Sequence, residues 1–121
     1  MLGHLTTAVA WEQAQLLGQY RVDSLQRQGF IHLSLADQVL LAAGSHYRGR
    51  TDLILLIIDP NRLDVDALVF EAGSPPNQHL IFPHLYGPLP LDAVLEVQPF
   101  PCQPDGSFRG PVTFQRRADT G

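Results

Sequence analysis

Three histidines of this sequence lie among apolar residues, each close to a glycine or a proline. They are His4 in Gly-His-Leu-Thr, His32 in Phe-Ile-His-Leu-Ser and His84 in Phe-Pro-His-Leu-Tyr-Gly-Pro. Burying an imidazole ring costs free energy unless the ring is hydrogen-bonded, so an ordinary strand does not need histidine there. An isolated carboxylate, Glu71, lies in a further apolar stretch. Histidines and carboxylates are the common acid–base groups of enzymes, so we predict that these four side chains line one polar pocket.

Three hydroxyl-bearing residues, Thr6, Ser34 and Tyr86, each follow one of these histidines by two positions. Residues two apart in a strand face the same side, so we expect all three beside the pocket. Structural alternatives stay open: a backbone bond for each histidine, a helix cap for Thr6, and a surface ion pair with arginine for Glu71. A helix cap is favoured for Ser34 over a nucleophile, because the sequence has no Gly-x-Ser-x-Gly elbow.

A metal site is the minor alternative for the three histidines. Three histidine ligands with an open fourth position are typical of catalytic zinc. Here no short ligand spacing such as His-Glu-x-x-His occurs, and His46 and His79 add no pattern. Cys102 is the single cysteine, which excludes an internal disulfide and a thiolate cluster. We therefore expect no bound metal. Phosphate-loop and dinucleotide fingerprints are also absent.

The elements that must position these side chains follow an α+β order. Two early helices are predicted, over residues 8–17 and after Ser34, with Gly18 ending the first and Ser34 capping the second. The apolar run over 53–58 predicts a strand buried on both faces. His84 falls in a proline-rich loop. The other strands are predicted over residues 1–5, 30–33, 68–72 and 92–97, and a hairpin turn over 104–107.

The length and composition of the chain limit its number of domains, its partners and its location. The 121 residues fit one domain, which we assign to residues 1–115, with 116–121 as a mobile C-terminal tail. The net charge is -4 and no lysine occurs, so a nucleic-acid partner is disfavoured, although a single phosphate would still be held. No apolar run approaches the roughly 20 residues that cross a bilayer, and no secretory signal is visible. We expect a cytoplasmic protein without a membrane partner; its oligomeric state is unknown.

Four stretches carry a resemblance to a known family over nearly the whole chain. They are His4–Thr6 with Trp11, Gly29–Ser34, Phe82–Leu89 and Asp105–Phe108. On these motifs the sequence resembles the bacterial domain-of-unknown-function family 952. That family looks related in fold to the ADP-ribosyltransferases. The resemblance implies a split, strongly bent β-sheet around a nicotinamide–dinucleotide cleft.

Two shorter likenesses imply a reaction. His4–Thr6 is similar to the His-Gly-Thr motif with which such transferases hold the nicotinamide ribose and amide, with Leu5 in place of glycine. Phe30–Ser34 is similar to the His-Val-His-Leu-Ser segment of the RNA 2′-phosphotransferases, which share the fold and consume NAD. Glu71 resembles the transferase carboxylate by its position on a later strand. The acidic loop motif that usually precedes this carboxylate is absent.

The resemblance thus implies transfer of ADP-ribose from NAD, as substrate, to an unknown acceptor. The implied catalytic residues are His4, His32, Glu71 and His84, and the implied cofactor-binding residues are His4, Thr6, Ser34 and Tyr86. The alternative is a non-catalytic protein of the same fold that binds a nucleotide or a small anionic metabolite. The leucine at position 5 and the missing acidic loop favour that alternative.

Overall fold

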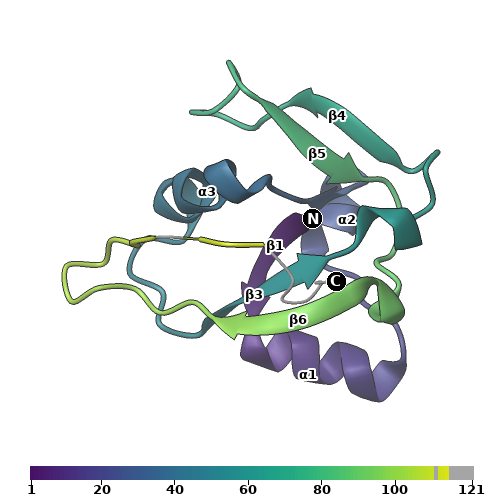
Figure 1. Ribbon diagram of the computed structural model, residues 1–121, viewed down its shortest axis with the longest axis horizontal. Helices are drawn as coiled ribbons and strands as arrows, with labels where there is room; N and C mark the ends of the chain where they lie inside the picture. Colours follow the sequence, from purple (N-terminus) through teal and green to yellow (C-terminus); the bar gives the residue numbers. More distant parts are fainter. Residues whose placement is uncertain (111, 115–121) are drawn as a thin grey trace.

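Two antiparallel sheets of three strands each organise this small α+β domain, which the computed structural model describes over residues 1–110 and 112–114 (Figure 1). The first sheet has the order β1-β3-β6, with β1 at Leu2–Thr7, β3 at Leu53–Ile58 and β6 at Val94–Pro99. The second has the order β2-β5-β4, with β2 at Ile31–His32, β5 at Ile81–Leu85 and β4 at Leu68–Ala72. The predicted α+β class is confirmed.

Three short α-helices accompany the sheets: α1 at Ala8–Leu17, α2 at Asp23–Gln28 and α3 at Val39–His46. Short 3-10 turns lie at Ala36–Gln38, Pro60–Arg62 and Leu91–Ala93. Within the described residues, no helix is long and apolar enough to span a membrane.

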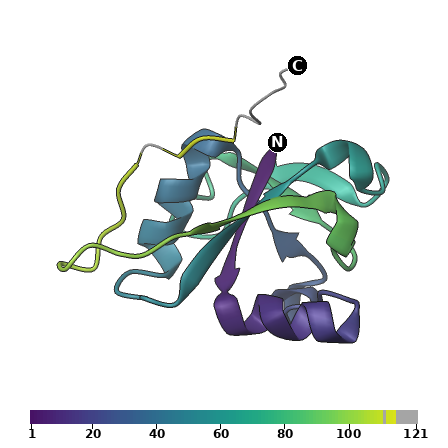
Figure 2. The same ribbon diagram turned by 60° about the horizontal axis from the view of Figure 1, so that its bottom comes forward.

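Burial follows the two faces of β3, the central strand of the first sheet. Leu56 and Ile58 point into a core that also contains Ala14 of α1 and Leu85 of the second sheet. Leu55 and its neighbour Ile57 belong to a separate core on the other face, with Val39 and Ala43 of α3. Helices α1 and α3 therefore cover opposite faces of the first sheet (Figures 1 and 2). The prediction that 53–58 is buried on both faces is confirmed.

The two sheets meet at one backbone bridge between Gly3 and Ser34. The amide of each residue donates to the carbonyl oxygen of the other, both at 2.8 Å. Gly3 also has no room for a side chain, because a Cβ there would lie 2.6 Å from Phe114 Cζ and 3.1 Å from Leu55 Cδ1. Glycine at this position lets the start of β1 approach the end of β2 and keeps both sheets in one body.

We expect Gly3→Ala to lower the free energy of unfolding by about 1–3 kcal/mol, since an extra methyl group in a packed interior forces neighbours to shift. Urea unfolding measures this change. Gly44→Ala is the matched control, because Gly44 lies in α3 with no atom within 4 Å of an added Cβ. That substitution should be neutral or stabilising by about 1 kcal/mol. Equal effects of the two substitutions would contradict the packing argument.

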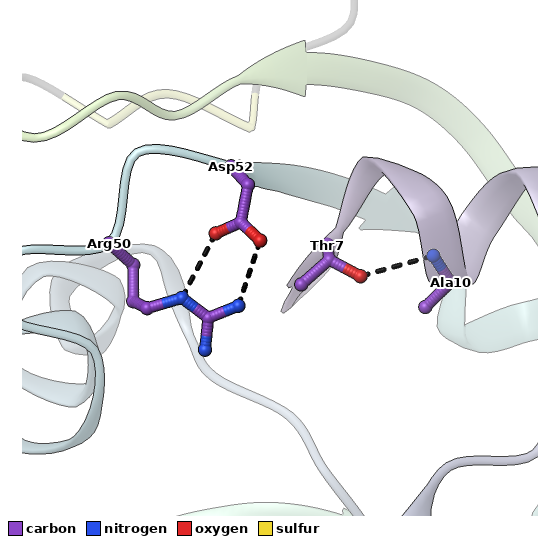
Figure 3. Close-up of polar contacts among 4 residues, drawn as sticks. All are labelled: Thr7, Ala10, Arg50 and Asp52. Carbon is purple, nitrogen blue, oxygen red and sulfur yellow. Dashed lines mark hydrogen bonds and ion pairs between the residues drawn. The ribbon is translucent and has the colours of Figure 1, made fainter.

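The start of α1 is fixed by polar contacts at the end of β1 (Figure 3). The Thr7 hydroxyl accepts a hydrogen bond from the Ala10 amide at 3.0 Å, which is a side-chain N-cap. The Ala8 amide donates to the carbonyl oxygen of Asp52, whose carboxylate binds Arg50 with two hydrogen bonds. Gly18 ends the helix at a φ of 76°, in the left-handed region. The predicted helix over 8–17 is confirmed with its boundaries.

Four predictions about local structure need correction. Ser34 does not cap a helix, because its backbone is held in the bridge to Gly3, and the following 3-10 turn has Leu35 at its N-cap. His84 lies in β5 rather than in a loop, because it pairs with His32 of β2 on one side and Val69 of β4 on the other. Residues 23–28 form a third early helix. The turn over 104–107 exists, but no strands flank it in the described residues. The predicted tail over 116–121 lies outside the described residues.

Candidate functional site

A pocket of about 740 Å³ lies where β1, α3 and the second sheet come together. The segment that connects α1 to α2 closes another side of it. Five of the seven polar residues selected from the sequence line this pocket: His4, Thr6, His32, Ser34 and His84. Glu71 and Tyr86 are not among its lining residues. The structure thus brings side chains from distant segments to one cavity.

His84 is the pocket residue with the most specific chemical arrangement. Its side chain is 3% exposed, and its Nδ1 lies 2.7 Å from Oε2 of Glu71. Hydrogen bonds from Tyr86 and His84 lower the pKa of the Glu71 carboxyl, so this group is ionised at neutral pH. A carboxylate only accepts hydrogen bonds, so the proton of this pair lies on Nδ1. No residue in the described part of the chain hydrogen-bonds Nε2 of His84, so this ring nitrogen is free to contact a ligand in the pocket.

Strand register explains the pairing of His84 with Glu71. His84 of β5 lies opposite Val69 of β4, and Glu71 lies opposite Phe82. Residues opposite each other in an antiparallel pair share a face, so His84 and Glu71 are diagonal neighbours on one face of the sheet. The Tyr86 hydroxyl also donates to Oε2 of Glu71. The carboxylate therefore reaches the pocket through His84, and it forms no ion pair with an arginine among the described residues.

Phe30 holds the His84 ring from its other side. The two rings are stacked at a centroid distance of 4.0 Å and an interplanar angle of 17°. His32, directly opposite His84 in the register, packs edge-on against it at 5.4 Å and 79°. An aromatic wall and a fixed carboxylate together restrict the imidazole to one orientation, as an acid–base group requires.

His4 is buried and uses both ring nitrogens within the wall of the pocket. Its Nδ1 lies 2.7 Å from the carbonyl oxygen of His32, and its Nε2 lies 2.7 Å from the Tyr20 hydroxyl. The same hydroxyl contacts Oγ1 of Thr6 at 2.8 Å. Burial lowers the pKa of His4 to about 4, so the ring is neutral at pH 7. These contacts make His4 a positioning group that joins β1 to β2.

We expect Tyr20→Phe to destabilise the protein by about 1–3 kcal/mol, because it leaves a ring nitrogen and a hydroxyl in the interior without their shared partner. Chemical unfolding at pH 7.5 tests this. Tyr47→Phe is the matched control: its half-buried hydroxyl has no hydrogen bond to any part of the chain that the structure describes. If both variants lose the same free energy of unfolding, the hydrogen bonds of the Tyr20 hydroxyl do not stabilise the protein as proposed.

His32 is the second neutral imidazole of the site. Its Nε2 lies 2.8 Å from Oε1 of Gln28 in α2. Burial lowers its pKa to about 4, and electrostatic coupling to His84 and His46 acts in the same direction. Two residues on, Ser34 is buried in the pocket wall, and its hydroxyl has no partner among the described residues. His4 and His32 therefore contribute neutral polar groups to the pocket at pH 7, and its permanent charges come from Arg21 and Asp23.

The free edge of β1 contributes backbone groups at Leu5. Gly3 points its amide and carbonyl away from β3, toward Ser34. Backbone groups alternate along a strand, so the amide and carbonyl of Leu5 point to the same free edge. No described residue pairs with them, and Leu5 lines the pocket. This edge offers one donor and one acceptor at a fixed spacing, a pair suited to a carboxamide.

Sequence reasoning missed two residues of this site. Tyr20 follows the glycine that ends α1, and it is buried with its hydroxyl on His4. Asn77 follows two prolines in the segment between β4 and β5, and it is 5% exposed and lines the pocket. Neither Tyr20 nor Asn77 belongs to a sequence motif, so only the folded structure shows that they are part of the site. Within residues 1–110 and 112–114, no group of three histidine, cysteine or acidic side chains is arranged to hold a metal ion.

Comparisons with known proteins agree with this fold. The model of a family described as "Protein of unknown function (DUF952)" matches residues 5–97. Crystal structures of protein CC0527 from Caulobacter crescentus and of its double mutant each superpose with a TM-score of 0.78 at 28% identity, covering 89% of this chain and 92% of theirs. The solution structure of CC0527 gives a TM-score of 0.74 at the same identity, with 89% and 90% covered. No curated protein matches the sequence.

Proposed function

The chain belongs to the DUF952 family, and we propose that it cleaves NAD and transfers the ADP-ribosyl group to water or to another acceptor. The observation that carries this proposal is the convergence in one pocket of His4, Thr6, Ser34 and the Glu71-bound His84. The two sheets, joined at the Gly3–Ser34 bridge with the pocket beside it, suit the split sheet of an ADP-ribosyltransferase-like fold. That fold relationship is part of the proposal.

Cleavage of the nicotinamide glycosidic bond needs positioning and charge stabilisation more than covalent machinery. The bond from the ribose carbon to the pyridinium nitrogen breaks, and its electron pair leaves with nicotinamide. The acceptor oxygen then bonds to that carbon and gives its proton to Nε2 of His84. Glu71 holds the proton on Nδ1 and stabilises the imidazolium that forms. The backbone edge at Leu5 would bind the carboxamide.

A second candidate is binding of a nucleotide or small anionic metabolite without turnover. One observation favours it: both nitrogens of His4 are already hydrogen-bonded within the protein, which leaves that ring no lone pair for a ribose hydroxyl. In this case Arg21, which also lines the pocket, would pair with a phosphate. Either function would use the same pocket, and an assay of turnover distinguishes the two.

Calorimetric titration with NAD and with ADP-ribose, followed by an assay of nicotinamide release, tests both candidates. Binding with nicotinamide release supports the NAD-cleaving function. Binding of ADP-ribose or NAD without release supports the non-catalytic alternative. If neither ligand binds, both candidates are wrong.

A further inference from the structure

Asn77 is a buried amide whose backbone and side chain are both anchored. Its amide N–H donates to the Ser74 carbonyl at 2.7 Å, and its own carbonyl accepts from Leu80 at 3.0 Å. Its side-chain Nδ2 donates to Oγ of Ser45 in α3 at 3.0 Å. These contacts link the 74–80 turn to α3 and fix the plane of the side-chain amide. The direction in which its side-chain oxygen, Oδ1, points is therefore also fixed.

Oδ1 accepts no hydrogen bond from any residue of the described chain, and Nδ2 keeps one N–H beyond its bond to Ser45. Asn77 is 5% exposed and lines the pocket together with His32 and His84. A buried carbonyl oxygen without a donor destabilises the folded protein, because it has lost its hydrogen bonds to water. Buried polar atoms are nearly always satisfied, so a donor from the pocket is expected to fill this place.

The surroundings of Asn77 favour an uncharged donor. The pocket residues contributed by α3 and by the segments 73–77 and 82–84 include no lysine and no arginine. Arg21 and Asp23, the pocket residues with permanent charge, belong to the segment that leads into α2. A ligand carboxylate beside Asn77 would face the Oδ1 lone pairs with no permanent cation from these segments to offset the repulsion. A ligand amide would donate to Oδ1 directly.

We propose that Asn77 determines specificity: Oδ1 accepts a hydrogen bond from the carboxamide N–H of the ligand, which selects nicotinamide dinucleotides over nicotinic acid dinucleotides. This inference rests on the proposed function. It assigns a second contact to the carboxamide, which carries two N–H groups, beyond the backbone edge at Leu5. A carboxylate in the same position has no proton to donate and is repelled.

The experiment compares calorimetric affinities for NAD and for nicotinic acid adenine dinucleotide. Wild-type protein should bind NAD about 10- to 100-fold more tightly. Asn77→Leu should weaken NAD binding by about that factor, while the affinity for the nicotinic acid compound changes less than about threefold. Asn77→Asp keeps an acceptor and a partner for the Ser45 hydroxyl, so it should retain the preference for NAD even if the leucine variant folds poorly.

Gln78→Leu is the matched control, because it removes an exposed amide from the same turn and should change neither affinity. Equal wild-type affinities for the two dinucleotides would overturn the inference. So would a loss of both ligands by the same factor in a folded Asn77→Leu protein, because that is the result of a structural role alone. If wild-type protein binds the dinucleotides with the opposite preference, the inference is also wrong. Binding of neither dinucleotide overturns the proposed function itself.

Discussion

Replacing His84 with asparagine is expected to lower the rate of nicotinamide release by about 10²–10⁴-fold, the usual contribution of a positioned acid–base group. The asparagine side-chain nitrogen can still donate to Glu71, so the carboxylate keeps a partner. The free nitrogen at the pocket is lost, together with the ring that stacks on Phe30. Because this nitrogen acts on the acceptor and not on the bound dinucleotide, the affinity for NAD should change by less than about fivefold. Steady-state release of nicotinamide and calorimetric binding measure the two quantities.

His79→Asn is the matched control for this experiment, since His79 is an exposed histidine on the loop between β4 and β5. It should retain the wild-type rate. A folded His84→Asn protein that binds NAD and releases nicotinamide at the wild-type rate would remove His84 from the mechanism. A loss of NAD binding in parallel with the rate would instead indicate a binding role.

Acidification is expected to destabilise the protein between pH 6.5 and about pH 4, chiefly through His4. Burial lowers the pKa of His4 in the folded protein to about 4, whereas an unfolded histidine titrates near 6.5. In this interval the unfolded chain binds a proton that the native ring does not, so stability falls as the pH falls. Over the whole interval the loss from His4 is about 3 kcal/mol. His32, whose pKa is also lowered to about 4, adds to it in the same direction.

Urea unfolding at intervals from pH 7.5 to pH 4 measures this slope. The pKa values of Asp52 and Glu71 are lowered in the folded protein. The stability that these two carboxylates contribute is therefore lost only from about pH 4 downward. His4→Gln should make it shallower by one proton, even if its stability at pH 7.5 is lower. A flat stability across this interval would contradict the buried, neutral state of His4.

Parts of the fold follow from local patterns that a sequence carries in full. The strand bounds 53–58 and 68–72 are the same in the prediction and in the structure, because continuous or alternating apolar residues identify a buried or half-buried strand. The end of α1 at Gly18 follows from the left-handed conformation that glycine adopts without strain. The apolar surroundings of His4, His32 and His84 also predict a common pocket, and all three line one cavity in the structure.

The chemistry of that pocket depends on long-range pairing, which no local pattern encodes. The hydrogen bond from His84 to Glu71 exists because β4 and β5 pair in one register, and a shift by one residue would place the two side chains on opposite faces. His4 is hydrogen-bonded on both nitrogens only because Tyr20, 16 residues away, returns to the same core. Sequence alone therefore determined which residues are polar in apolar surroundings, whereas tertiary structure decided which of their nitrogen and oxygen atoms remain free for a ligand.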